Sequence, residues 1–138
     1  MQTPNFPTRD EVLILHDDQI ATYGGTTGLR DVGLLDSALA QPMATFGGEL
    51  LHPTLADQAA AYLYHLSRNH PFVDGNKRTA FAVMDAFIEA NGYRLTLSDD
   101  EAYDLVLQVA QGYVEKGSLA RQLAAALDPI APSASNPN

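Results

Sequence analysis

Apolar residues recur at helical spacing through most of the chain, in segments separated by short polar or glycine-containing stretches. The clearest segment follows Thr54, where five apolar residues share one helical face: Leu55, Ala59, Tyr62, Leu63 and Leu66. Brief alternation over Tyr93–Leu97 indicates an extended stretch, and the glycines and prolines between Pro42 and Pro53 indicate a loop or a small hairpin. The pattern therefore predicts an all-α fold.

Residue pairs that can form capping boxes mark three helix starts: Thr8 with Glu11, Thr54 with Asp57, and Ser98 with Glu101. Helix ends are expected at Gly24-Gly25, before Pro42 and at Asn91-Gly92. We expect the helix after Ser98 to include Tyr113. Gly117-Ser118 should then separate it from a last helix that ends near Asp128-Pro129.

The helix that begins at Lys77 differs from the others because it is apolar nearly all round. Between Ala80 and Ala90 only Asp85 and Glu89 are polar. Since a helix of this kind is surrounded by protein, we expect it at the centre of a helical bundle. The bundle should form one domain over residues 1–128, followed by a disordered tail over 129–138 that is rich in Pro, Ser, Asn and Ala.

Composition narrows the classes of function. The 138 residues are 46% hydrophobic, and 17 Asp and Glu against 8 Lys and Arg give a formal net charge of -9. An acidic chain disfavours broad electrostatic binding to nucleic acid or to an anionic membrane surface. The absence of cysteine excludes disulfides and thiolate metal sites. We expect neither a membrane span nor a signal peptide, and a cytoplasmic location.

The candidate chemistry lies in His70–Thr79, where one helix ends and the apolar helix begins. A helix start offers free N–H groups and a positive dipole end, which suit an anion. Gly75 lets the backbone approach a ligand closely, and Asn76 offers an amide donor. Lys77 and Arg78 are mildly unfavourable at a helix start, by ~0.3–1 kcal/mol each, unless an anion is bound there.

Two further residues extend this site toward catalysis. Asp74 can hold a divalent ion such as Mg²⁺ against phosphate oxygens, and His70 can accept a proton from an attacking hydroxyl. The segment therefore contains the parts needed for phosphoryl or nucleotidyl transfer. Each residue type also has an ordinary structural use, as a turn, a solvated helix end, an N-cap or a helix-terminal residue. Residue chemistry alone leaves both interpretations open.

The run HPFVDGNKRTA resembles the central signature of the Fic/Doc superfamily. Four N-terminal segments resemble its Doc (death-on-curing) toxins: Leu15–Asp17, Tyr23–Gly25, Gly28–Asp31 and Leu34–Leu39. The resemblance covers roughly Glu11–Leu127. It implies a Fic-type helical bundle with the motif loop at the N-terminus of the buried central helix.

The resemblance also implies roles for individual residues. His70 would be the general base, Asp74 would position Mg²⁺, Gly75 and Asn76 would form an anion hole, Lys77 and Arg78 would bind the phosphates of ATP, and Phe72 would anchor the loop. The implied protein is a toxin that moves the terminal phosphate of ATP to a Thr or Ser hydroxyl of a translation protein, in the class of elongation factor Tu. Its implied partner is an antitoxin whose C-terminal segment binds the toxin.

Departures from the family patterns keep other functions open. Lys77 stands where Fic adenylyltransferases have Gly, and Phe81 stands where they usually have a second Arg. The resemblance to Doc-type toxins implies that this pattern goes with transfer of the terminal phosphate. Gly75, in contrast, matches the adenylyltransferases, since the best-known Doc pattern has Ala there. Adenylyl transfer and a catalytically silent, antitoxin-binding domain are the alternatives.

The Ser/Thr-x-x-x-Glu-Gly/Asn inhibitory motif of self-restrained Fic proteins does not occur in the sequence. We therefore expect the activity to be controlled by the partner antitoxin.

Several residues outside the motif stay open as candidates. His16, His52 and His65 lack metal-ligand spacing, and we expect His16 to form a polar network with Asp17 and His65 to lie at the surface. Ligand contact is an open alternative for Arg30-Asp31 and for Arg68. The loop at Gly47-Gly48 is either a target-docking flap, as the family resemblance implies, or a mobile connector.

Overall fold

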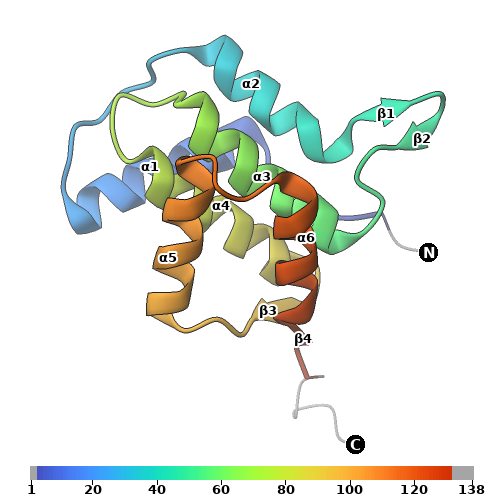
Figure 1. The fold of residues 1–138 in the computed structure, drawn as a ribbon. Helices are drawn as coiled ribbons and strands as arrows, with labels where there is room; N and C mark the ends of the chain where they lie inside the picture. The colour runs from blue at the N-terminus through green and yellow to red at the C-terminus, as the bar shows by residue number, and fades with distance from the viewer. Residues whose placement is uncertain (1–2, 132–138) are drawn as a thin grey trace, which may run out of the picture.

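Helices dominate the computed structural model, which describes residues 3–131 (Figure 1). The six helices are α1 (Arg9–Tyr23), α2 (Val32–Ala40), α3 (Leu55–Asn69), α4 (Asn76–Ala90), α5 (Asp99–Ala110) and α6 (Lys116–Ala125). A 3-10 turn (Gln41–Met43) follows α2. The strands are short: β1 (Thr45–Phe46), β2 (Glu49–Leu50), β3 (Tyr93–Leu95) and β4 (Leu127–Pro129). The predicted all-α class is confirmed.

All three predicted capping boxes form. The hydroxyls of Thr8, Thr54 and Ser98 each accept from the N–H three residues ahead, at 3.1, 3.0 and 3.2 Å. Each N3 carboxylate accepts in return from the N–H of its N-cap residue. Such reciprocal pairs satisfy N–H groups that a helix start otherwise leaves free. The predicted starts of α1, α3 and α5 are therefore confirmed.

The strands pair into two small antiparallel sheets. β1 pairs with β2, with Thr45 opposite Leu50 and Phe46 opposite Glu49, so the stretch between Pro42 and Pro53 does contain a hairpin. β3 pairs with β4, with Arg94 opposite Asp128, and so joins the chain after α4 to the chain after α6. The extended stretch expected at Tyr93–Leu97 is confirmed over its first three residues.

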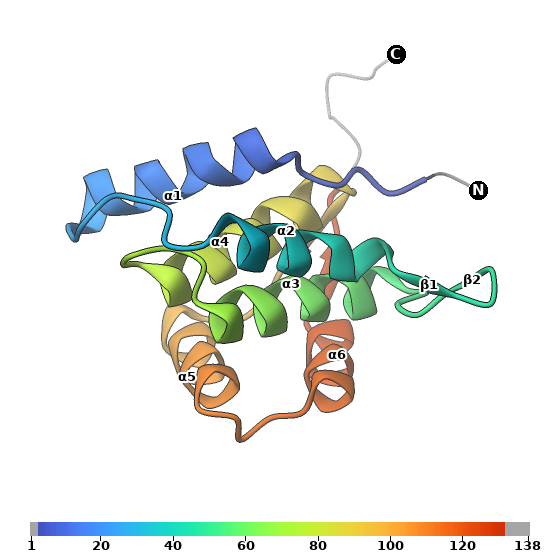
Figure 2. The ribbon, with the colours of Figure 1, turned by 90° about the horizontal axis from the view of Figure 1, so that it is seen from above.

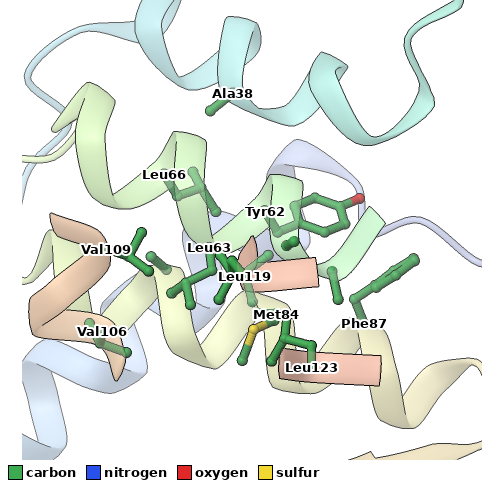
Figure 3. Close-up of a cluster of buried hydrophobic side chains, with 14 of the residues drawn as sticks. Ala38, Tyr62, Leu63, Leu66, Met84, Phe87, Val106, Val109, Leu119 and Leu123 are labelled. Atoms are coloured by element: carbon green, nitrogen blue, oxygen red, sulfur yellow. The ribbon is translucent and has the colours of Figure 1, made fainter. Parts of the chain in front are cut away.

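α3 occupies the middle of the bundle. It packs against α2, α4, α5 and α6, and α1 lies along α4 on the far side of α4 from α5 and α6 (Figure 2). Tyr62, Leu63 and Leu66 of α3 are buried among side chains of the neighbouring helices (Figure 3). Nine of the fifteen α3 residues are buried, against six of fifteen in α4. α3 is thus the most enclosed helix, and α4, which carries the motif at its start, lies buried between α1 and α3.

The physical reason lies in the small residues of α3. Ala59, Ala60 and Ala61 are fully buried and allow neighbouring helices to approach on several sides, and the polar Gln58 and Ser67 are buried as well. In α4, by contrast, the side bearing Asp85 is only partly covered. Side-chain size, and not only polarity, decided which helix became enclosed.

The C-terminal part of the chain differs from the prediction in two places. α5 ends at Ala110, because Gly112 has φ +82° and the Tyr113 N–H bonds back to the Gln108 carbonyl, as in a Schellman motif. Tyr113 therefore lies outside the helix and is 78% exposed. Gly117 and Ser118 lie within α6, which begins at Lys116 and ends at Ala125. The burial of Leu119 and Leu123 outweighs the low helix propensity of one glycine.

The ordered chain continues past the predicted domain boundary at Asp128. Pro129 belongs to β4, and the N–H of Ile130 donates to the Gly92 carbonyl at 2.9 Å. Residues 132–138 of the predicted disordered tail lie outside the described residues. Across residues 3–131, no helix has the length and apolarity needed to cross a membrane.

Candidate functional site

The segment His70–Gly75 connects α3 to α4 and lies against the loop Gly24–Asp31, which follows α1. The Pro71 carbonyl accepts from the N–H groups of Arg30 and Asp31 at 2.7 and 3.0 Å. The Val73 N–H donates to the Gly28 carbonyl at 3.0 Å. These bonds join two stretches that are far apart in the sequence, so the loop after α1 forms a second wall of the site.

Asn76 holds the motif loop closed. Its amide oxygen accepts from the Phe72 N–H at 2.9 Å, and its amide nitrogen donates to the Phe72 carbonyl at 3.0 Å. The side-chain amide is thus engaged within the protein. What Asn76 offers to an anion is its backbone N–H, which lies in the first turn of α4 and has no partner within the helix.

The buried Phe72 side chain anchors the motif loop in the core, and His16 of α1 packs against it. Phe72 is 2% exposed, and its ring stacks on the His16 imidazole with centroids 3.9 Å apart. His16 Nε2 lies 2.8 Å from the Asp74 carbonyl oxygen. The expected pairing with Asp17 is looser, at 3.9 Å between Nδ1 and Oδ1. His16 therefore positions the loop, a role that sequence reasoning missed because 58 residues separate it from Asp74.

The Asp74 carboxylate is exposed and held by backbone donors. Oδ2 accepts from the Thr26 N–H at 3.1 Å, and Oδ1 accepts from the Gly75 N–H at 2.8 Å. These hydrogen bonds lower the pKa of Asp74 below its usual value, with a smaller contribution from Arg78. Each oxygen keeps a lone pair for a further partner. An ionised, exposed, pre-oriented carboxylate fits Mg²⁺, which often takes one protein carboxylate and completes its shell with phosphates and water.

Gly75 is the N-cap of α4 and has φ +75°, a conformation that favours glycine. A Cβ atom at this position would lie 3.0 Å from Ile20 Cδ1 and 3.8 Å from His16 Nε2, so glycine also permits the close packing of the loop on α1. Because Gly75 has no side chain, it caps none of the first N–H groups of α4. The helix therefore begins with donors directed outward.

Lys77 and Arg78 follow, with different surroundings. Lys77 is exposed and has no hydrogen bond or ion pair with any residue between 3 and 131. Arg78 donates to the carbonyls of Gly24 at 3.0 Å and Gln19 at 3.4 Å, and its guanidinium lies over the Tyr23 ring at 5.8 Å. Arg78 thus fixes α4 to the end of α1, whereas Lys77 is free to meet a ligand.

His70 ends α3 in a left-handed conformation, with φ 49° and ψ 56°. Among residues 3–131 it is the one non-glycine residue with positive φ. Arg30 stabilises this turn, since Nε donates to the His70 carbonyl at 2.7 Å and Nη2 to the Asn69 carbonyl at 3.1 Å. The His70 residue is exposed. Such a conformation is costly outside glycine and is concentrated at functional sites.

The other candidates take structural positions. Asp31 is the N-cap of α2, and its carboxylate accepts from the Leu34 N–H at 3.0 Å. Arg68 bonds the Val109 carbonyl and lies over the Tyr64 ring. His65 is half-buried and lies 3.0 Å from Lys116 Nζ, so the expected surface position is wrong.

His52 is buried, and burial lowers its pKa. Within the described chain, no three His, Asp or Glu side chains gather closely enough to hold a metal ion by themselves. A metal at Asp74 would therefore depend on oxygens supplied by its ligand.

Comparison with known proteins finds a family and two relatives that match most of the chain. The model of the Fic/DOC family matches residues 6–88, which include the loop after α1 and the whole motif. A protein named Toxin Doc from Mycolicibacterium smegmatis is 46% identical over 104 residues, covering 74% of this chain and 80% of that protein. Protein kinase doc from Escherichia phage P1 is 32% identical over 114 residues, covering 83% of this chain and 89% of that protein.

Proposed function

This chain belongs to the Fic/DOC family, with Doc-type relatives, and from that premise we propose that it is the toxin of a toxin–antitoxin pair. Its reaction would transfer the terminal phosphate of ATP to a Thr or Ser hydroxyl of a translation protein. The names Toxin Doc and Protein kinase doc, carried by two relatives, support the toxin role and the phosphate transfer. The target class, elongation factor Tu, follows from the resemblance to Doc toxins.

The observation that carries the proposal is the uncapped start of α4. Three N–H groups, those of Asn76, Lys77 and Arg78, have no partner within the helix, and Lys77 stands exposed beside them. In a chain with a net charge of -9, this local concentration of donors and positive charge favours a bound anion. A polyphosphate satisfies both the N–H groups and the lysine.

The remaining residues would supply the chemistry around this phosphate-binding start of α4. His70 would accept the proton of the attacking hydroxyl, and its exposure at the end of α3 gives a protein substrate access to it. Asp74 would hold Mg²⁺. When bound, Mg²⁺ neutralises charge on the phosphate oxygens. His16, Arg30 and the side-chain amide of Asn76 keep the loop in place, while the backbone N–H of Asn76 would donate to the phosphate.

Two partners follow from this role. An antitoxin would bind the toxin through its C-terminal segment and suppress the activity. A translation protein would be the substrate, and the reaction would take place in the cytoplasm.

Adenylyl transfer is the second candidate, and Gly75 is the observation that favours it. The glycine matches the adenylyltransferase form of the motif, and it leaves no side chain at the N-cap of α4, where a phosphate would bind. In that reaction, the α-phosphate and the nucleoside would move to the target hydroxyl.

Isotope position distinguishes the two reactions. Purified toxin, free of antitoxin, is incubated with a bacterial translation extract and with ATP labelled at either the γ- or the α-phosphate. The proposal predicts protein labelling from γ-labelled ATP only, and none with the His70→Ala variant. Labelling from α-labelled ATP only would overturn the phosphate-transfer proposal in favour of adenylyl transfer.

A further inference from the structure

Lys116, the first residue of α6, lies beside His65 of α3, with Nζ 3.0 Å from the imidazole Nε2. Because two protonated groups would have no acceptor between them, at least one member of this pair is neutral. Both residues are half-buried. Among residues 3–131, Lys116 forms no ion pair with a carboxylate. The lysine therefore lacks the partner that usually stabilises its charged form.

The aromatic ring of Tyr64 forms an apolar wall beside the pair. Lys116 Nζ lies 5.8 Å from the centre of this ring, and the His65 ring meets it edge-on with centroids 5.1 Å apart. The Arg68 guanidinium lies over the same ring at 5.2 Å and brings positive charge without an acceptor. The amine is thus surrounded by an imidazole, an aromatic ring and a second cation.

The protonation states of the pair follow from these surroundings. Burial lowers the pKa of Lys116, and burial and then the Lys116 charge lower the pKa of His65 to about 4. His52, from the segment before α3, also disfavours a proton on His65, whereas Asp57 favours one on His52. Glu115, the N-cap of α6, is exposed. At neutral pH the imidazole is therefore a proton acceptor, and Lys116 contains more free amine than an ordinary lysine.

We propose that Lys116 is a site of acylation by small acyl thioesters, with His65 as the acceptor of the amine proton. The lone pair of the free amine attacks the thioester carbonyl, and a C–N bond forms. The proton on this nitrogen passes to His65 Nε2 and from there to solvent. The C–S bond breaks, and the thiolate leaves with the bonding electrons and takes up a proton. The products are an amide on Lys116 and a free thiol.

The fold tolerates the acylated product. A cation in the first turn of a helix is mildly unfavourable, so a neutral amide on Lys116 does not weaken the start of α6. Loss of the lysine charge also removes one of the effects that lower the pKa of His65, so acylation should raise that pKa. Neither residue belongs to the proposed phosphate site, and the inference does not depend on the proposed function.

The test uses the full chain and an uncharged reagent, the acetyl thioester of N-acetylcysteamine, which the cations of a phosphate site do not attract. Lys77 is the internal control, because it is the only other lysine and is exposed in the first turn of α4. Mass spectrometry after chymotrypsin digestion gives the acetylation rate of both lysines in one sample. At about pH 7.5, Lys116 should react about five-fold faster or more than Lys77. In urea, which unfolds the chain, the two rates should become equal.

Two substitutions test the role of His65. His65→Gln keeps a hydrogen-bond acceptor but cannot take up a proton, and His65→Leu removes both functions. Each should lower the Lys116 rate about five-fold or more and leave the Lys77 rate unchanged, with circular dichroism showing that the variant is folded.

The rate ratio in the unmodified chain requires no variant and tests the proposal by itself. Equal rates for Lys116 and Lys77 in the folded, unmodified chain would overturn it. An unchanged Lys116 rate in either folded His65 variant would also overturn it. Both results leave the proposed phosphate site intact, because that site uses neither Lys116 nor His65.

Discussion

His16 Nε2 and the Asp74 carbonyl oxygen lie 2.8 Å apart, which ties the middle of α1 to the centre of the motif loop. Because a carbonyl oxygen only accepts, Nε2 carries the proton in this bond. The same imidazole stacks on Phe72, two residues before Asp74. The buried His16 side chain thus contacts the loop at two points, the Phe72 ring and the Asp74 carbonyl, and so fixes the position of the loop on α1.

Replacing His16 by Phe should retain the stack on Phe72 and remove the bond to Asp74. We expect a loss of about 1 kcal/mol in the free energy of unfolding, measured by urea denaturation. We also expect faster hydrogen exchange at Gly75 and Asn76 and a lower transfer rate. Asp17→Asn is the control, since the Asp17 side chain is exposed and 3.9 Å from Nδ1. Unaltered loop exchange and transfer rate in His16→Phe would show that the bond does not position the loop.

His70 is tested by a pair of substitutions that separate catalysis from backbone strain. Both His70→Ala and His70→Gly remove the imidazole, so both should reduce transfer by about 10²–10⁴-fold. With φ at 49°, glycine fits the position better than alanine. His70→Gly should therefore be about 1 kcal/mol more stable than His70→Ala in thermal unfolding. Growth arrest by either variant, equal to that of the unmodified chain, would exclude proton abstraction by His70.

Lys77 and Lys116 form a matched pair, since they are the only two lysines and both lie in the first turn of a helix. Lys77→Ala should weaken ATP binding about ten-fold or more through the loss of a charged contact. Its unfolding free energy should change by less than about 0.5 kcal/mol, because a cation at a helix start stabilises little. Lys116→Ala should leave ATP affinity unchanged in calorimetry. Equal effects of the two substitutions would contradict a phosphate role specific to Lys77.

His65 gives the protein a pH-dependent stability that is separate from the site. Burial, and then the charge of Lys116, lower the pKa of His65 to about 4. The unfolded chain binds a proton at this histidine near its usual pKa of 6.5, so the folded state loses stability as pH falls from 6.5 toward 4. His65→Gln should flatten the fall in unfolding free energy over that window, as measured by urea denaturation at several pH values.

Lys116→Ala provides the control for this titration. Removing the lysine should raise the pKa of His65 in an NMR titration, since its charge disfavours the protonated imidazole. A His65 pKa near 6.5 in the unmodified chain would show that the ring is not held neutral by its surroundings.

Local signals made much of the helical framework predictable. Thr8, Thr54 and Ser98 each form the capping box that their sequence context predicts, because a capping box needs only residues three positions apart. The motif residues His70–Arg78 were likewise contiguous in the sequence. The structure brings them to one helix start because the chain turns there.

The missed features depend on contacts between distant parts of the chain. His16 reaches Asp74, and Arg30 reaches His70, only once α1 and the loop after it have packed on the motif. The enclosure of α3 depends on how closely Ala59–Ala61 let other helices approach, which polarity alone does not reveal. Gly117 lies inside α6 because burial of Leu119 favours the helix there.

The most direct test follows the backbone amides of Gly75–Thr79 in the antitoxin-free protein by NMR while ATP and Mg²⁺ are added. Our account predicts that these amide signals shift in a saturable manner, and that the shifts weaken in Lys77→Ala but persist in Lys116→Ala. If the signals of Gly75–Thr79 remain unmoved at saturating ATP and Mg²⁺, the start of α4 is not a polyphosphate site.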